Sequence, residues 1–169
     1  MKICLFFLLL LSPFRFTVFA QQLNSSKYAI IPYDNTNIYV AQKFHAGFGK
    51  TELTDKEIEV IDTMLVKSVR EYNVKQFEVY KTDHKKDTST MLEWYLIDLK
   101  KYRFQFVPAM TTQGQKVIWV NGFCEYFDSQ AGNWRQKIVL VYDGGICFFN
   151  LMVDVTKNIY YNFSVNSNG

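Results

Sequence analysis

The stretch LTDKEIEVIDTMLVKSVREY, residues 53–72, decides the fold. It opens with a capping box, because Thr54 can accept a hydrogen bond from the amide of Glu57 while the Glu57 side chain reaches back to the amide of Thr54. Apolar residues then recur every three or four positions, at Ile58, Ile61, Leu65, Val69 and Tyr72. This spacing gives one apolar helical face. The pattern predicts an amphipathic helix over about 55–72 that ends at Asn73.

The rest of the chain is rich in strand-forming residues separated by short turns. Asp143-Gly144-Gly145 is a strong hairpin turn, and Pro108 closes a long aromatic run. We expect strands over 38–41, 77–81, 91–107 (one bent strand or two), 116–127, 138–142, 146–153 and 159–165.

One helix followed by antiparallel strands, without βαβ alternation, predicts an α+β fold class. A sheet of this kind buries one face, so we expect the one main helix to pack its apolar face on a curved antiparallel sheet. This order of elements resembles that of cystatin-like and NTF2-like domains over about residues 38–165. The resemblance concerns the arrangement only, because function depends on the site rather than on the fold.

The first twenty residues have the layout of a secretory signal peptide. Lys2 precedes an apolar run over residues 3–11, and Val18 and Ala20 place small residues before a cut after Ala20. The alternative is an uncleaved anchor, which Arg15 disfavours, and the apolar run is shorter than the ~20 residues of a membrane span. We therefore expect a secreted or periplasmic protein with no stable membrane insertion after cleavage.

Length and charge limit the class of the remaining chain. The 169 residues include 19 Lys and Arg against 16 Asp and Glu, and the leader takes two of the basic residues with it. Domains that bind nucleic acid are usually more basic, so we expect no nucleic-acid partner. Residues 21–37 are polar and turn-rich and predict a flexible N-terminal arm, and residues 38–166 suit a single α+β domain.

The sequence offers no catalytic constellation. Its two histidines, His45 and His84, lie in turn-rich segments, and neither Cys-x-x-Cys nor His-x-x-x-His spacing occurs. Gly49-Lys50-Thr51 lacks the glycine that a phosphate-binding loop needs five residues earlier, where Phe44 stands. We therefore predict no catalytic residue, no cofactor and no metal site.

Aromatic residues make up 17% of the chain and concentrate in or beside the expected strands. They favour strands in any protein, so packing in the core explains most of them. Others would line a concave face of the sheet, where they would hold a small apolar ligand or anchor a protein partner. The candidate contact residues are Trp134, which follows a polar loop and is expected to be exposed, Trp94 and Trp119, which are expected in the core, and Tyr102.

Cys124 and Cys147 are the two cysteines beyond the leader, and an exported protein can join them in a disulfide. However, the strand expected over 138–142 would lie between their strands and separate them by about 10 Å. A disulfide needs Cα atoms within about 7 Å. The sequence leaves a disulfide and two buried free thiols open, and the predicted spacing favours the free thiols.

A second resemblance rests on three segments, Val120-Asn121-Gly122-Phe123-Cys124, Trp134 and the run from Asp143 to Asn150. Over about residues 52–165 the chain resembles small exported bacterial proteins. Members of that group often carry a cysteine where Gly122 stands, so the cysteine arrangement differs here. No activity follows from this resemblance.

These observations predict an exported, non-enzymatic binding or interaction domain whose partner is a protein or a small apolar ligand. An NTF2-like enzyme is one alternative, and it would need a buried acid or base among His45, Asp98 and Glu125. A cystatin-like peptidase inhibitor is another, and it would need a Gln-x-Val-x-Gly hairpin and a Pro-Trp hairpin. Residues 115–119 lack the glycine, and no Pro-Trp pair occurs.

Overall fold

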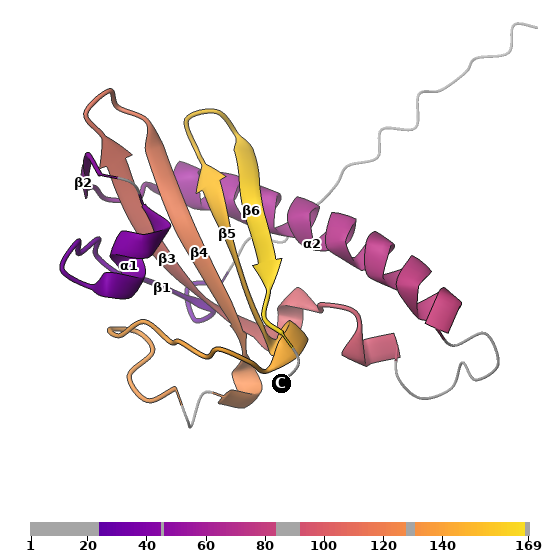
Figure 1. Ribbon diagram of the computed structural model, residues 1–169. Coiled ribbons are helices and arrows are strands. Elements are labelled where there is room, and N and C mark those ends of the chain that lie inside the picture. Colours follow the sequence, from indigo (N-terminus) through magenta and orange to yellow (C-terminus); the bar gives the residue numbers. More distant parts are fainter. Residues whose placement is uncertain (1–23, 45, 84–91, 128–130, 168–169) are drawn as a thin grey trace, which may run out of the picture.

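The structure is a computed structural model that describes residues 24–44, 46–83, 92–127 and 131–167. The predicted signal peptide, His45 and His84 lie outside the described residues. One long helix packs against a six-stranded sheet (Figure 1). The predicted fold class is therefore confirmed: the chain is α+β, with a helix on a mostly antiparallel sheet.

The sheet has the strand order β1-β3-β4-β5-β6, and β2 also pairs with β3. All pairs are antiparallel except β1 with β3, which are parallel. The strands are β1 (Tyr28–Ile30), β2 (Phe48–Lys50), β3 (Tyr102–Thr111), β4 (Lys116–Cys124), β5 (Phe148–Asp154) and β6 (Ile159–Val165).

The long helix α2 (Asp55–Asp83) begins with the predicted capping box. The Thr54 amide donates to Glu57 Oε2 at 2.8 Å, and the Glu57 amide donates to Thr54 Oγ1 at 3.3 Å. The apolar face of α2 packs on one face of the sheet, where β3, β4 and β5 contribute large apolar side chains. This core includes Ile61, Leu65, Val69, Phe104, Phe106, Val120, Phe149 and Leu151.

The predicted end of the helix is wrong. α2 continues ten residues past Asn73 and includes residues 77–81, which were expected to form a strand. Asn73 does not end the helix because its side chain bonds to another segment: Nδ2 donates to the carbonyl of Ile97, and Oδ1 accepts from the Ile97 amide, both at 2.8 Å.

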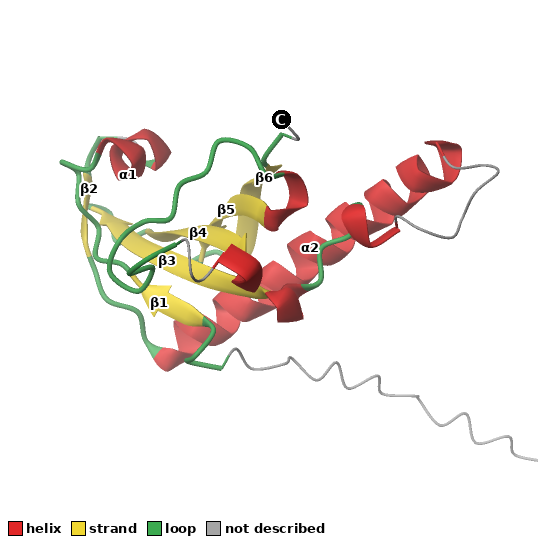
Figure 2. Ribbon diagram, turned by 90° about the horizontal axis from the view of Figure 1, so that it is seen from below, coloured by secondary structure: helices red, strands yellow, loops and turns green. Residues whose placement is uncertain are grey.

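The second face of the sheet is also covered, contrary to the expectation of a single buried face. The short helix α1 (Ile38–Lys43) and residues 131–141 lie on this face, on the opposite side of the sheet from α2 (Figure 2). Residues 38–41 were expected to form a strand, but Asn37 caps a helix there by accepting from the amides of Tyr39 and Val40. The result is a three-layered domain with two apolar cores.

The predicted flexible arm is wrong for the part that the structure describes. Residues 28–30 form β1, which adds to β3 in parallel register. Ala29, Ile31 and Tyr33 are buried in the second core. The strand was missed because its apolar residues span only a few positions and lie among many turn-forming residues.

The segment before β3 and the segment before β5 also differ from expectation. Residues 92–94 and 99–101 form short 3₁₀ helices, so the strand predicted from residue 91 begins at Tyr102. Residues 138–142 form no strand. Buried polar side chains hold that segment instead: Gln105 Oε1 accepts from the Val139 amide at 2.8 Å, and Asn121 Nδ2 donates to the Val139 carbonyl at 2.8 Å.

Because 138–142 is not a strand, β4 and β5 are direct neighbours in the sheet. Cys124 at the end of β4 and Cys147 just before β5 are joined by a disulfide, with their Cα atoms 4.9 Å apart. The interpretation of two free thiols is therefore wrong in this structure. The bond closes the segment that covers the second face.

Candidate interaction surface

Three of the four candidate contact residues are buried. Trp119 and Tyr102 lie in the two cores, and Trp134, expected on the surface, is 9% exposed. Trp94, expected in the core, is instead 71% exposed. Of the four, only Trp94 has a side chain that is mostly exposed to solvent.

Trp134 is held as a structural residue by its neighbours. Its ring packs edge-on against Phe123, with 5.8 Å between centroids, and the guanidinium groups of Arg103 and Arg135 lie 5.9 and 4.5 Å from it. Arg135 also donates to the backbone carbonyls of Ser26 and Tyr28. The polar loop before Trp134 therefore does not expose it.

Tyr102 and Trp119 serve the cores in different ways. The Tyr102 hydroxyl donates to the Ile146 carbonyl at 2.6 Å, and burial raises its pKa well above the ordinary range. Trp119 packs under the Lys43 ammonium, 5.4 Å from the ring centroid. Tyr102 is enclosed in the core between α2 and the sheet, and Trp119 is enclosed in the core on the second face. Neither side chain therefore lines an open surface.

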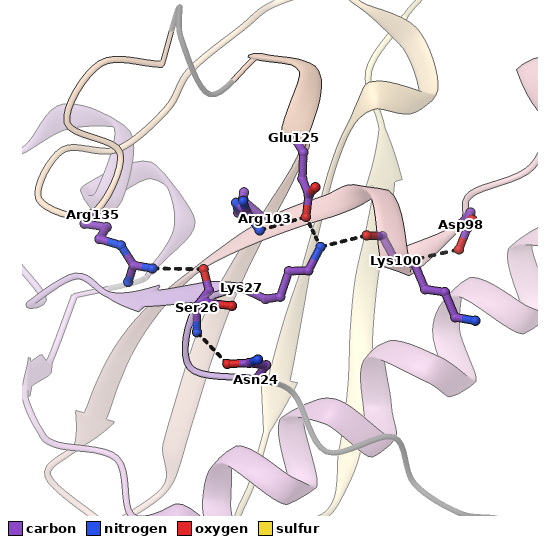
Figure 3. Close-up of polar contacts among 8 residues, drawn as sticks. All are labelled: Asn24, Ser26, Lys27, Asp98, Lys100, Arg103, Glu125 and Arg135. Atoms are coloured by element: carbon purple, nitrogen blue, oxygen red, sulfur yellow. Dashed lines mark hydrogen bonds and ion pairs between the residues drawn. The ribbon is translucent and has the colours of Figure 1, made fainter.

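The two described acids that an enzyme would use are both occupied by structural contacts (Figure 3). Glu125 accepts from Arg103 at 2.7 Å and pairs with Lys27, whose ammonium also donates to the Lys100 carbonyl. Asp98 is exposed and caps a 3₁₀ helix by accepting from the Lys100 amide at 3.1 Å. Neither carboxylate lies among the buried residues of the two cores.

One open groove lies beside α2. It has a volume of about 580 Å³ and is lined by the helix from Val66 to Glu78 and by residues 97–100. We call it the α2 groove. It forms because the C-terminal half of α2 extends beyond the sheet past β6, while residues 92–100 run back alongside it (Figures 1 and 2).

Two contacts hold the second wall of the α2 groove against the helix. The paired hydrogen bonds between Asn73 and the backbone of Ile97 fix residues 97–100. Further along, the rings of Tyr80 and Tyr95 meet with 5.4 Å between centroids. These contacts leave the groove open between them on the solvent side.

The α2 groove is apolar with charges at its rim. Val74 and Phe77 are 60% and 41% exposed, and Val66 and Leu99 add apolar surface. Arg70 and Glu78 stand on the helix side, and Asp98 and Lys100 stand on the other side. This combination suits an apolar binding partner that carries charges of both signs.

Sequence reasoning missed Val74 and Phe77 because it ended the helix at Asn73. A signal was present: residues 74–83 contain neither Gly nor Pro and include Lys, Gln and Glu, which favour helices. Val66, Arg70, Val74 and Phe77 then fall on one side of a continuous helix.

Two further searches of the described residues bear on function. No three His, Cys, Asp or Glu residues of the described segments gather as a metal ion would require. Among the described helices, none combines the length and the apolar character that crossing a membrane requires.

Comparison with known proteins adds no family. No protein-family model, no curated protein and no solved structure matches this chain. The resemblances in element order and in short segments therefore stay predictions, and function must be inferred from the site itself.

Proposed function

We propose that this protein is a non-enzymatic interaction domain that holds an amphipathic helix of a protein partner in the α2 groove. The observation that carries the proposal is the exposure of Val74 and Phe77 on a helix half with no sheet beneath it. Single exposed apolar residues are common, but a grouped set beside a groove is typical of an interaction site.

Burial of this set would supply the binding free energy. Covering a Val or Phe side chain is worth up to about 1.5–3 kcal/mol each relative to exposure. Val66, Val74 and Phe77 together would offset a large part of the cost of ordering two partners. The same side chains contribute little to the stability of the fold, because they lie outside both cores.

The shape of the groove fits a helix. Glu78 lies twelve positions after Val66, which is about 18 Å along α2 and about three turns of a partner helix. An open groove of this length accepts the apolar stripe of an amphipathic helix, whose anchors recur at intervals of three and four residues.

The rim charges define the partner further. Arg70 and Glu78 are eight residues apart, about 12 Å along the helix. Arg70 has no ion-pair partner among the described residues, and Glu78 pairs with Lys81 at the surface. A partner helix with an acid and a base about two turns apart beside its apolar stripe would complement both positions.

We further propose that the domain acts outside the cytoplasm. The leader has the layout of a signal peptide, and the Cys124–Cys147 disulfide is of the kind that forms in exported proteins. Labelled fractionation of cells that produce the full chain would test this, with the N-terminal residue of the exported form read by mass spectrometry. Recovery of the uncut chain from the cytoplasm would contradict it.

The binding proposal is tested with two synthetic peptides of about 15 residues. One carries leucines on a single helical face and a Glu and a Lys two turns apart, and the other is a scrambled sequence of the same composition. We expect the first peptide to bind in a fluorescence-anisotropy titration and the scrambled one to bind at least tenfold more weakly. Equal binding of both, or of neither, would overturn the proposal.

A matched pair of variants locates the binding. F77D places a carboxylate in the groove and is expected to weaken binding of the first peptide at least tenfold. V79D makes the same change at an exposed apolar residue of α2 that does not line the groove. We expect V79D to bind as the unchanged protein does, and loss of binding in V79D would show that the groove is not the site.

A further inference from the structure

A second hollow lies at the far side of the sheet from α2. It has a volume of about 560 Å³, within the range of small-molecule sites, and is separate from the α2 groove. Three segments that are distant in sequence form it: residues 31–40, residues 136–140 and Lys50 of β2. We call it the α1 hollow.

The lining of the α1 hollow is mixed, with apolar side chains at its base and polar ones around them, and its walls are held in place. Ile31, Tyr33 and Val40 are buried in the second core and form its base. Ile138 and Leu140 stand on the opposite wall. That wall is held in place because Gln105 Nε2 donates to the Lys137 carbonyl at 2.7 Å and Gln105 Oε1 accepts from the Val139 amide. The hollow is therefore formed before any ligand binds.

The mouth of the α1 hollow carries more positive than negative charge. Lys50 and Lys137 come from two different walls, and Asp34 is the one acidic residue among the described residues that line it. The Asp34 carboxylate already accepts from the amide and the hydroxyl of Thr36, at 2.9 and 2.7 Å. These hydrogen bonds, helped by Lys50, lower the pKa of Asp34, so it stays ionised.

The two lysines and one aspartate leave a net charge of one positive unit at the mouth, which favours a ligand with one anionic group. Asp34 offsets one lysine, and the ion pairs found among the described residues do not include Lys137. Lysine ammonium groups act as point charges, and the described lining includes no arginine that would grip a phosphate with two parallel hydrogen bonds. A carboxylate is the anion that this mouth suits best.

We propose that the α1 hollow binds a small amphiphile that has a carboxylate at one end and an apolar chain or ring at the other. The carboxylate lies between Lys137 and Lys50, and the apolar part lies on Ile31, Tyr33 and Val40. This site is independent of the α2 groove, which lies on the other side of the sheet.

Three probes with the same ten-carbon chain test the charge requirement: decanoate, decanol and decylammonium, each below the concentration at which it aggregates. Binding is followed by chemical-shift changes of backbone amides in the full exported chain. We expect affinity to fall in that order, with decanoate about tenfold tighter than decanol. The shifts should map to residues 31–40 and 136–140.

Two lysine variants complete the test. K137M keeps most of the side-chain volume but removes the charge, and it is expected to weaken decanoate about tenfold while leaving decanol unchanged. K56M changes an exposed lysine at the start of α2 and serves as the matched control, with no expected effect. Decanol binding as tightly as decanoate, shifts confined to the α2 groove, or unchanged affinity in K137M would each overturn the proposal.

Discussion

The two halves of α2 have the same secondary structure and opposite surroundings. In the first half, residues 55–69, Ile61, Leu65 and Val69 are enclosed by the sheet. In the second half, residues 70–83, Val74, Phe77 and Val79 are exposed, and Tyr80 is the buried apolar residue. The first half is held by the core. The second half is held at its start, where Tyr72 packs against Phe163 of β6, and further along at Asn73 and Tyr80 by the segment that returns to β3.

This difference teaches that apolar residues on one helix can serve two purposes. Where a sheet lies beneath them, they stabilise the fold, and the free energy of unfolding depends on them. Where the helix extends past the sheet, they are exposed, and we expect their substitution to leave the free energy of unfolding nearly unchanged. Substitutions in the two halves should therefore separate stability from binding.

The largest expected effect is on stability, from Leu65→Ala in the first half. Leu65 is fully buried, and removal of its side chain leaves a cavity between α2 and the sheet. We expect the free energy of unfolding to fall by about 2–5 kcal/mol, measured by urea denaturation. At urea concentrations below the unfolding transition, peptide affinity should be unchanged. A loss of affinity in this variant would show that binding depends on the first half of α2 as well.

Asn73→Ala acts at the boundary between the halves. It removes two hydrogen bonds to Ile97 and leaves the backbone groups of that buried residue unsatisfied, at a cost of about 1–3 kcal/mol. We expect the backbone amides of residues 92–100 to exchange their hydrogens faster. The amides elsewhere should exchange more slowly than these. Uniformly faster exchange over the whole sheet would show that the second half is not a separate unit.

Trp94→Ala tests the surface residue that lies beside the second half. Trp94 stands three residues before Ile97, a residue of the groove wall, and its side chain is mostly exposed. We expect little change in stability and a weakening of peptide binding by about fivefold, or about 1 kcal/mol. Unchanged affinity in anisotropy titrations would exclude Trp94 from the contact.

The smallest expected effect is a pH dependence at the point where α2 leaves the sheet. The Tyr160 hydroxyl donates to Glu71 at 2.5 Å, which raises the pKa of Tyr160 to about 12. This contribution to stability is complete below about pH 10, the ordinary value, and is lost as the pH rises towards 12. Tyr160→Phe should therefore show a shallower alkaline loss of stability in thermal unfolding, and an identical pH profile would contradict this role.

The sequence predicted the elements whose patterns are long and regular. The capping box at Thr54 and the apolar period through Val69 located the start and the buried face of α2. The strand expected over 159–165 has those bounds, and the strand expected over 116–127 forms over 116–124, with residues 125–127 in a 3₁₀ helix. In these elements, local preference and burial agree.

The sequence failed where contacts distant along the chain decide the structure. Asn73 looks like a helix end, but its bonds to Ile97 form only in the folded state. Residues 138–142 look like a strand, but Gln105 and Asn121 satisfy that backbone with side chains. The same error disfavoured the disulfide. The strand expected over 138–142 would have lain between the strands of Cys124 and Cys147, but β4 and β5 are direct neighbours.

The candidate surface lies on α2 and residues 97–100 rather than on the sheet face that the sequence suggested. An aromatic contact surface was expected, and Trp94 is exposed, but Trp134 is enclosed by Arg103, Arg135 and Phe123. Exposure of a single side chain depends on which segments pack over it, and no local pattern carries that information. Val74 and Phe77 emerged only once the full length of α2 was known.

The most direct test of the account is Phe77→Asp, with unfolding free energy and peptide affinity measured on the same sample. Phe77 lies on the exposed half of α2, so we predict a stability change within about 0.5 kcal/mol and at least a tenfold loss of affinity. A stability loss as large as that of Leu65→Ala, or an unchanged affinity, would contradict the claim that the second half of α2 is a binding surface.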